Sequence, residues 1–508
     1  MAASMKSKRV IVIGAGLGGL SAALHLVAKG FQVTLLEKNP TVGGKLNRIR
    51  AGGYTFDTGP SLVTMPDILR DTFAVAGARL EDYLTLQPLD PICRYRWPDG
   101  AQLDLSADLS KTVAELRRLA PEDEAAFFRF LSYGADLYTA TAPVFLFCDF
   151  RDWRQVWRHF DRRLLRQLPR LFTLKTVADR TTEFFSSPYL RQLFNRYATY
   201  NGSSPYRAQA TFCLIPYVEF AFGAWYVVGG LYRIAEALLH VAVAQGVTVQ
   251  TNTAVAEIVV KDRRVRGVRL EDGNFLTAEV VVSNADSLYT YARLLPGLRR
   301  RTYNDRRLAR IEPSCSGFIL LLGTRRRFDT LAHHNIFFSS DYPREFSEIF
   351  DTMTPPRDPT IYVCATSRTD PTQAPPGGEN LFVMVNAPAL CEAYDWDNIA
   401  SEYRCHIVAR LEALGLTGLS ESIVVEERLT PKRFAGWFNA YRGAIYGLSS
   451  NSLRNAFWRP PIRAQEAQGL YFAGGGTHPG GGIPLVLLSG KLAAAAVAED
   501  LGLSPALT

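Results

Sequence analysis

Three glycines and one glutamate near the N-terminus have the types and the spacing that bind a dinucleotide. Gly14, Gly16 and Gly19 form the pattern G-x-G-x-x-G, and Glu37 closes the next apolar segment of the chain. In such a pattern the first glycine permits a tight turn, the second lets backbone approach a pyrophosphate, and the third lets helix and strand pack closely. An acidic residue at the position of Glu37 accepts hydrogen bonds from ribose hydroxyls.

The segments around this motif are predicted to form the β-α-β unit that it needs. Residues 8–13 are apolar and rich in β-branched side chains, which is typical of a buried parallel strand. Residues 20–29 have the apolar spacing of a helix that ends at Gly30, and residues 31–36 form a second apolar strand. The ligand phosphates are therefore expected at the N-terminus of the helix, where free N–H groups and the helix dipole favour negative charge.

Two further glycine-rich segments indicate that the dinucleotide is FAD rather than NAD. Gly43, Gly44 and Lys45 follow soon after Glu37, and a glycine pair with a cation can meet the other side of the pyrophosphate. Near the C-terminus, residues 469–473 are predicted to form a short strand, residues 474–482 a glycine-rich turn and residues 485–501 a helix. A ligand that both ends of the chain contact is long, as FAD is.

Composition and charge exclude several other classes of protein. The net charge is +8 and 47% of the residues are hydrophobic, which fits a globular protein with a large core. There is no zinc-finger spacing and no RNP motif, so nucleic acid is not an expected partner. The seven cysteines form no C-x-x-C pair, which fits a reducing cytoplasm. We expect no signal peptide and no membrane span, so that any membrane attachment is peripheral.

Residues 151–175 have the pattern of a basic amphipathic helix. Trp153 and Trp157 lie on its apolar side, and arginines occupy much of the remaining surface. Such a helix either lies on an anionic membrane or is an ordinary surface helix with a basic solvent face. Pro169 is expected to break or kink it near its end.

The motifs of the chain resemble those of the bacterial and fungal carotenoid desaturase family, which includes the phytoene desaturases. The resemblance runs nearly from end to end, and it rests on residues 14–19, 43–45, 57–61, 223–230 and 476–480. Residues 62–66, 333–338 and 442–447 are most similar to enzymes that act near the chain end of an already desaturated carotenoid. These enzymes are the 3,4-desaturases and the diapocarotenoid terminal-methyl oxygenases.

The resemblance implies an α/β fold of the two-domain type found in amine oxidases and Rab GDP-dissociation inhibitors. A Rossmann-like FAD-binding domain would be discontinuous and comprise residues 1–70, 230–300 and 460–508. Residues 71–229 would form a helical, membrane-facing substrate region, and residues 301–459 a substrate-binding domain with a mixed sheet.

The resemblance also implies which residues line the cofactor. Val255 would hold the adenine through its backbone, and Gly475 and Ile483 would approach the ribityl chain and the flavin. Many flavoenzymes have an aspartate where Gly475 stands, but carotenoid desaturases lack it as well. The full set is Gly14, Gly16, Gly19, Glu37, Gly44, Lys45, Pro60, Val255, Gly475 and Ile483.

The implied function is that of a desaturase that binds FAD non-covalently and introduces conjugated double bonds into an acyclic carotenoid of the phytoene, neurosporene or lycopene class. The resemblance further implies a hydrophobic tunnel, a membrane-resident substrate, oxygen or a quinone as electron acceptor, and a cytoplasmic enzyme peripheral to the membrane. The alternative within the family is a diapocarotenoid terminal-methyl oxygenase. Two alternatives lie outside the family, namely another flavoprotein oxidoreductase, such as an amine oxidase, and a non-catalytic prenyl-protein binder. The intact FAD motifs argue against the prenyl-protein binder.

No catalytic residue is assigned from the sequence. Glu219 lies in an apolar stretch and is either a buried base or a helix-surface residue. For Arg207 three roles are open, namely steering the substrate, pairing with an acid, or exposure at the surface. His478 lies in the glycine-rich turn, where it would tune the flavin. His333 and His334 are neighbours, and neighbours on a strand point to opposite faces, so we predict no metal site.

Overall fold

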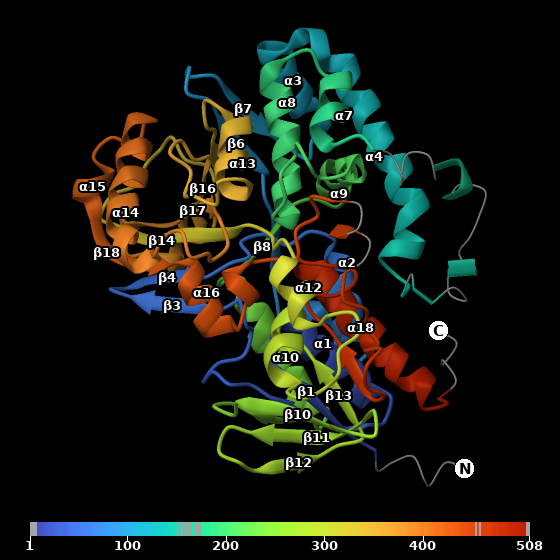
Figure 1. The fold of residues 1–508 in the computed structure, drawn as a ribbon. Helices are drawn as coiled ribbons and strands as arrows, with labels where there is room; N and C mark the ends of the chain where they lie inside the picture. The colour runs from blue at the N-terminus through green and yellow to red at the C-terminus, as the bar shows by residue number, and fades with distance from the viewer. Residues whose placement is uncertain are drawn as a thin grey trace.

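The computed structural model describes residues 8–149, 151–152, 156–157, 164–167, 174–452, 455–456 and 459–503. Its elements gather in three regions, which Figure 1 shows as a parallel sheet with its helices at the bottom, a mixed sheet at the upper left and a group of helices at the top. The parallel sheet and the mixed sheet are the parts that position the candidate site.

The parallel sheet contains the predicted dinucleotide-binding unit. Its strand order is β19-β13-β1-β2-β9, and each neighbouring pair is parallel. The strands are β1 (Arg9–Ile13), β2 (Gln32–Leu36), β9 (Thr248–Gln250), β13 (Val280–Ser283) and β19 (Leu470–Phe472). The central strands β1 and β13 are buried along nearly their whole length, as apolar strands covered on both faces should be.

Three helices pack around this sheet, namely α1 (Leu17–Ala28), α10 (Arg233–Ala244) and α18 (Ile483–Asp500). The helix predicted over 20–29 begins earlier, because Gly18 and Gly19 already lie within its first turn. The first and last helices approach closely, since a Cβ at Gly490 would lie 2.5 Å from the carbonyl oxygen of Gly18. The two ends of the chain thus meet beside the glycine motif.

A small antiparallel sheet adjoins this unit and consists of β10 (Val255–Lys261), β11 (Arg264–Leu270) and β12 (Phe275–Thr277). The apolar segments 265–270 and 275–282, with a turn at 271–273 between them, predict a hairpin of two strands, and the pairing of β11 with β12 confirms the hairpin. The expected single strand over 275–282 is wrong, because the chain divides there into β12 and β13. The second half leaves the hairpin since its residues are fully buried beside β1.

The mixed sheet has seven strands in the order β18-β14-β17-β16-β15-β6-β7. Strands β15 and β6 are parallel, and the other neighbouring pairs are antiparallel. Helix α14 (Trp396–Ala413) covers one face, where Trp396 packs with Phe318. The strands are β6 (Cys93–Arg96), β7 (Gln102–Leu105), β14 (Ser316–Thr324), β15 (His334–Phe337), β16 (Ile361–Cys364), β17 (Glu379–Ala387) and β18 (Ile423–Leu429).

The helical region is held together by aromatic side chains. The ring centroids of Phe130 and Phe194 lie 4.8 Å apart, and those of Phe185 and Phe194 lie 4.9 Å apart. Its helices are α3 (Leu109–Leu119), α4 (Glu124–Phe145), α7 (Val177–Phe184), α8 (Pro188–Asn195) and α9 (Leu214–Phe222). Within the described ranges, no helix is both long and apolar enough to cross a membrane. The basic helix predicted over 151–175 lies largely outside the described residues.

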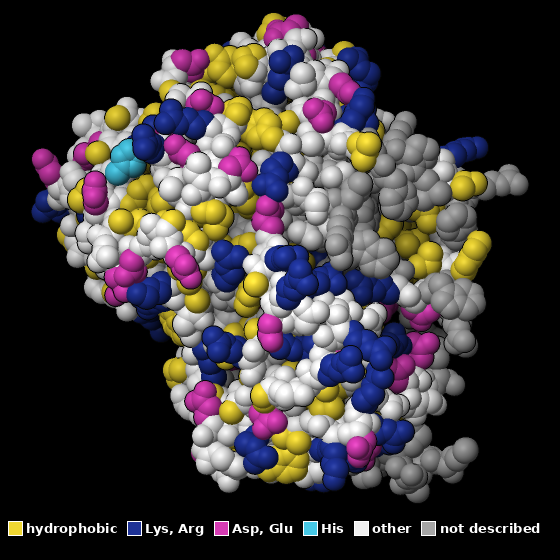
Figure 2. Space-filling model, in the orientation of Figure 1, with side chains coloured by type: hydrophobic (Ala, Val, Ile, Leu, Met, Phe, Trp, Pro, Cys, Tyr) yellow, Lys and Arg dark blue, Asp and Glu magenta, His cyan; other side chains and the backbone are white. Residues whose placement is uncertain are grey.

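Lysine and arginine side chains gather over the lower half of the face in Figure 2, in the area where Figure 1 places α12 (Asp305–Arg310) and the small antiparallel sheet. The fold also contains several shorter elements. They are β3 (Arg48–Ala51), β4 (Tyr54–Asp57), α2 (Pro66–Ala74), β8 (Trp225–Val227), α13 (Tyr342–Phe350) and α16 (Pro431–Phe438).

Candidate cofactor and substrate site

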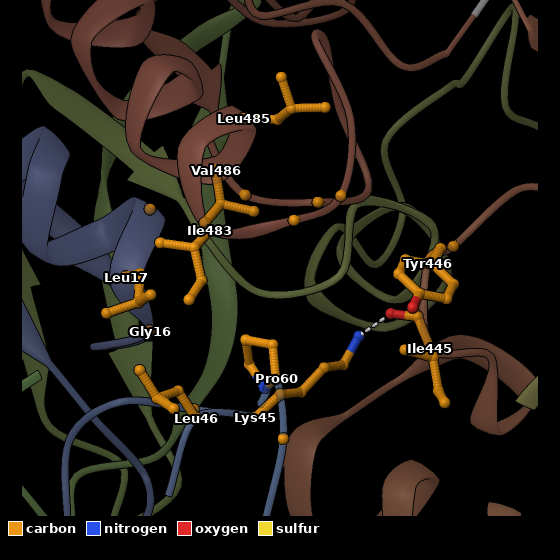
Figure 3. Close-up of a pocket in the computed structure, with 18 of the residues that line it drawn as sticks. Gly16, Leu17, Lys45, Leu46, Pro60, Ile445, Tyr446, Ile483, Leu485 and Val486 are labelled. Carbon is orange, nitrogen blue, oxygen red and sulfur yellow. Dashed lines mark hydrogen bonds between the residues drawn. The ribbon is translucent and has the colours of Figure 1, made fainter. Parts of the chain in front are cut away.

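A cavity of about 710 Å³ opens at the carboxyl ends of the parallel strands. Ligands of open α/β sheets bind at this edge, because the loops that leave the strands diverge there. Figure 3 shows Gly16, Lys45, Pro60 and Ile483 around this space, brought together from distant parts of the chain. Of the predicted cofactor residues, all but Gly19 line the cavity, namely Gly14, Gly16, Glu37, Gly44, Lys45, Pro60, Val255, Gly475 and Ile483.

Gly19 has a packing role instead. A Cβ on Gly19 would lie 2.0 Å from the carbonyl oxygen of Gly14, so α1 can start directly behind β1 only if this position has no side chain. Gly14 itself has a φ of +88°, which disfavours other residues. Both observations fit the roles that the motif assigns to its first and third glycines.

The second glycine pair lies against the first motif. The amide of Gly43 donates to the carbonyl of Ala15 over 2.7 Å, and a Cβ on Gly44 would lie 3.2 Å from the Cα of Gly16. Two stretches of bare backbone therefore face the same part of the cavity. A pyrophosphate suits such a place, because it needs close backbone approach and N–H donors.

Glu37 is buried and held in a fixed position. One carboxylate oxygen accepts from the amide of Ala15 over 2.8 Å, and the other from the amide of Asn39 over 2.9 Å. A carboxylate has further lone pairs that can accept hydroxyl groups. The amide of Thr253 donates to the backbone carbonyl of Glu37 over 2.8 Å, and Val255, two residues further on, lines the cavity and begins β10. The segment predicted to hold the adenine therefore contacts the residue predicted for the ribose.

Lys45 and Asp286 are half-buried groups of opposite charge on the cavity wall. Burial lowers the pKa of Lys45, and the carboxylate of Asp286 opposes that shift. Burial likewise raises the pKa of Asp286, opposed by Lys45. The ammonium group of Lys45 donates to the carbonyl of Ile445, as the dashed line in Figure 3 shows.

Arg459 was not found by sequence reasoning, although it fixes the C-terminal glycine turn. Its buried guanidinium donates to the carbonyls of Tyr446 over 3.2 Å and Gly475 over 3.3 Å. Burial lowers the pKa of Arg459 to about 10, so it keeps its charge at neutral pH. The amide of Gly474 donates to Ser489 over 2.7 Å, which ties the same turn to α18.

Asn284 was also missed, and it touches both glycine segments. Its side-chain amide donates to the carbonyl of Gly14 over 3.1 Å. Cβ atoms on Gly18 or Gly474 would each lie 2.6 Å from its oxygen. No local sequence pattern predicts the role of such a residue, because its partners are distant in the sequence.

The segments 57–61 and 223–230, which carry part of the family resemblance, meet at the buried carboxylate of Asp57, since a Cβ on Gly230 would lie 3.2 Å from both of its oxygens. Asp57 accepts from the amides of Leu231 over 2.7 Å and Tyr232 over 3.0 Å, where α10 begins. Burial raises the pKa of Asp57 to about 6, against the effect of these bonds. The contact fixes the segment that carries Pro60 to the cavity wall.

The far part of the cavity is mainly apolar. Helices α4 and α9 contribute to this wall together with the segments that follow β4 and precede β6. Its apolar residues include Leu62, Met65, Ile92, Phe145, Leu146, Phe212, Leu214, Ile215 and Val218.

Among the candidates for catalysis, Glu219 is buried, so the surface alternative is wrong. It accepts from the hydroxyls of Tyr197 over 2.6 Å and Tyr200 over 2.5 Å and lines the cavity. Arg207 instead pairs with Glu312 over 2.6 Å and is not among the lining residues. His478 lines the cavity, and burial lowers its pKa to about 4, so the ring is neutral.

The geometric argument about the histidine pair is also wrong. His333 precedes β15 and His334 begins it, and their ring centroids lie 4.5 Å apart. With Cys364 they form a group whose ligand atoms lie within 4.8 Å of one another. Burial raises the pKa of the Cys364 thiol, although a metal needs the thiolate. That the chain binds no metal stays a prediction.

Comparison with known proteins shows the family to which the chain belongs. Residues 17–498 match the family model of the flavin containing amine oxidoreductases. A 4,4'-diapolycopene oxygenase of Methylomonas sp is 40% identical over 98% of this chain and 99% of its own. A zeta-carotene-forming phytoene desaturase of Myxococcus xanthus is 35% identical over 99% of this chain and 98% of its own.

The fold is also that of a solved amine oxidase. Putrescine oxidase bound to putrescine has a TM-score of 0.63 at 16% identity, over 97% of this chain and 99% of that chain. The predicted two-domain α/β architecture is thereby confirmed. The chain belongs to the flavin containing amine oxidoreductases, in the group of the carotenoid desaturases and diapocarotenoid oxygenases, and is an FAD-dependent oxidoreductase.

Proposed function

We propose that the chain is a carotenoid desaturase that introduces conjugated double bonds into an acyclic carotenoid of the phytoene, neurosporene or lycopene class. The observation that carries this proposal is the continuity of one cavity from the glycine motifs to the apolar wall on α4 and α9. A long hydrocarbon fits such a wall, because apolar contact rather than hydrogen bonding would hold it. The relatives named above act on carotenoids by their names, which supports the same substrate class.

In this proposal the cavity-lining residues predicted for the cofactor hold FAD, and Gly19 permits the packing behind it. FAD, when bound, supplies the acceptor for a hydride from the polyene. The apolar side chains of α4 and α9 would position the polyene and exclude water from it.

We also propose the domain division given above, with residues 1–70, 230–300 and 460–508 as the FAD-binding domain. The five parallel strands fall inside these ranges, and β14 to β18 fall inside 301–459. Strands β6 and β7 come from the range 71–229 and complete the sheet of the other domain.

A second candidate is a diapocarotenoid terminal-methyl oxygenase. The identity of 40% to a 4,4'-diapolycopene oxygenase favours it, since the phytoene desaturase is 35% identical. Both candidates need the same FAD site and the same polyene cavity. They differ in whether the product gains oxygen.

We propose that the enzyme works peripherally at a cytoplasmic membrane surface, with oxygen or a quinone as electron acceptor. The net charge of +8 and the lysines and arginines on the face in Figure 2 support contact with anionic lipid. The hydrophobic substrate supports it too, because such a polyene resides in the bilayer.

The two candidates are separated by expression in bacteria that make lycopene, a C30 diapocarotene or phytoene, with product masses read after chromatography. Loss of two hydrogens per step is the expected result. A gain of oxygen would establish the oxygenase instead. Unchanged pigment in all three strains, with FAD bound to the purified protein, would contradict both.

A further inference from the structure

Three buried polar side chains of the cavity wall have unused hydrogen-bonding atoms. Arg196, His334 and Tyr342 all line it, and their exposed fractions are 9%, 3% and 4%. Each of them has a buried polar atom without a hydrogen-bond partner, namely the Nε of Arg196, the Nε2 of His334 and the hydroxyl of Tyr342. Buried polar atoms are nearly always paired, so a cluster of unpaired ones needs an explanation.

Arg196 is a buried cation without an ion-pair partner among the described residues. Its guanidinium lies over the rings of Tyr95, Tyr197 and Tyr200, at 5.3, 4.7 and 5.2 Å from their centroids. One Nη also donates to the hydroxyl of Tyr95 over 2.8 Å. The three rings offset part of the cost of burying the charge, but they leave the Nε–H unused.

His334 is held so that one ring nitrogen stays available. Its Nδ1 is bonded to the hydroxyl of Tyr362 over 2.8 Å, and that hydroxyl lies 2.5 Å from Ser61. Ser61 directly follows Pro60, a predicted FAD contact. Burial lowers the pKa of His334 well below its usual value, so the ring is neutral. We assign the tautomer in which Nδ1 accepts from the Tyr362 hydroxyl, so that the proton resides on Nε2 and Nε2 is a donor.

Tyr342 belongs to the same wall. Its ring packs edge-on against Phe338 with centroids 5.8 Å apart, and Phe338 stacks on Tyr95 at 5.9 Å. Tyr95 is the ring that Arg196 covers. Besides burial, the charge of Arg196 contributes to the lowered pKa of His334 and opposes the rise in the pKa of Tyr342, so the guanidinium lies near both groups. The three unpaired groups can all act as donors, and together they suit an oxygen atom that accepts hydrogen bonds.

We propose that Arg196, His334 and Tyr342 form a binding site for an oxygen atom at one end of the polyene, so that the enzyme binds an acyclic polyene with a terminal hydroxyl or aldehyde more tightly than the unmodified hydrocarbon. The inference rests on the proposed carotenoid function and specifies its substrate class. A pure hydrocarbon offers no acceptor to these donors. A site built to hydrogen-bond a substrate oxygen discriminates strongly against an analogue that lacks it, because the buried donors then stay unpaired.

The test compares two acyclic polyenes of equal length, one unmodified and one with a terminal aldehyde. Their dissociation constants are measured in detergent by titration of the FAD-loaded enzyme. In Arg196→Gln we expect the dissociation constant of the aldehyde to rise roughly 10- to 100-fold, as for loss of a charge-assisted bond, and that of the hydrocarbon to stay unchanged. Tyr342→Phe should show the same selectivity to a smaller extent.

Two controls separate binding from folding. Arg344→Gln makes the same chemical change on the exposed face of α13, where Arg344 has a side-chain exposure of 59%, and should alter neither constant. The bound aldehyde provides a second readout. Its absorption maximum should lie at shorter wavelength in Arg196→Gln than in the wild type, because the carbonyl loses a cationic donor.

Equal losses for both polyenes, or none for either, would overturn the assignment. A rise in the KM for dioxygen with unchanged polyene binding would also overturn it, since the oxygen held there would then be molecular oxygen. A wild-type enzyme that binds neither polyene, although loaded with FAD, would refute the proposed function as well. Binding of the hydrocarbon alone would refute only the oxygen site.

Discussion

The substitution Glu37→Gln tests the dinucleotide site at its best-defined polar contact. The two carboxylate oxygens accept separately from the amides of Ala15 and Asn39. An amide side chain has one acceptor oxygen, so one of these buried N–H groups loses its partner, at a cost of about 1–3 kcal/mol. A ribose hydroxyl that donates to the carboxylate loses a charge-assisted bond of about 1.5–3 kcal/mol.

The assay is titration of apoprotein with FAD, followed by flavin fluorescence. Loss of the hydrogen bond from the ribose hydroxyl corresponds to an FAD dissociation constant that is roughly 10- to 100-fold higher than in the wild type. Glu122→Gln makes the same change on an exposed side chain and should stay within about twofold. A dissociation constant for Glu37→Gln within about twofold of the wild type, in a protein that keeps its circular dichroism, would refute the reasoning.

Three further predictions follow from the structure. Gly19→Ala should abolish FAD binding and soluble expression, because its Cβ would lie 2.0 Å from the Gly14 carbonyl, whereas Gly436→Ala meets nothing within 4 Å and should behave as the wild type. Burial lowers the pKa of His25 to about 4 from 6.5, so the unfolded chain takes up the proton first on acidification. The free energy of unfolding of the wild type, relative to His25→Gln, should therefore fall by about 3 kcal/mol between pH 7 and pH 4 in urea titrations, and a constant difference would contradict the burial argument. Dialysis against EDTA should leave the activity unchanged, since the Cys364 thiol is held protonated; loss of activity that zinc restores would show a metal at the histidine pair.

Much of the dinucleotide unit could be predicted, because its signals are local. Apolar runs, a glycine pattern and a closing acid lie within one short stretch, and the strands appear as Arg9–Ile13 and Gln32–Leu36. The last helix was expected over 485–501 and is found over Ile483–Asp500. Strong hydrophobic periodicity predicts these elements without any tertiary contact.

Other elements depend on distant partners and were harder to predict. Strands β6 and β7 alternate buried and half-buried residues around a turn at 97–101, a hairpin signal that the surrounding helical pattern obscured. Strand β13 separates from the hairpin because it pairs with β1, which lies far away in the sequence.

The candidate site also contains some residues that local sequence predicts and others that depend on distant contacts. The spacing of the glycines and Glu37 predicts their roles. Arg459 and Asn284 instead act through hydrogen-bond partners that are distant in the sequence and that only the fold brings near. Glu219 allowed two interpretations, since a sequence cannot show that two tyrosine hydroxyls would meet a carboxylate in the interior.

The central claim is that the polyene reduces an FAD held in this cavity. The most direct measurement mixes the FAD-loaded enzyme with an acyclic carotene under anaerobic conditions and follows the absorption of oxidised flavin. We predict that this absorption is lost in a single turnover and that the product is lighter by two hydrogens. Flavin that stays oxidised with every acyclic carotene, hydrocarbon or oxygenated, would contradict the account.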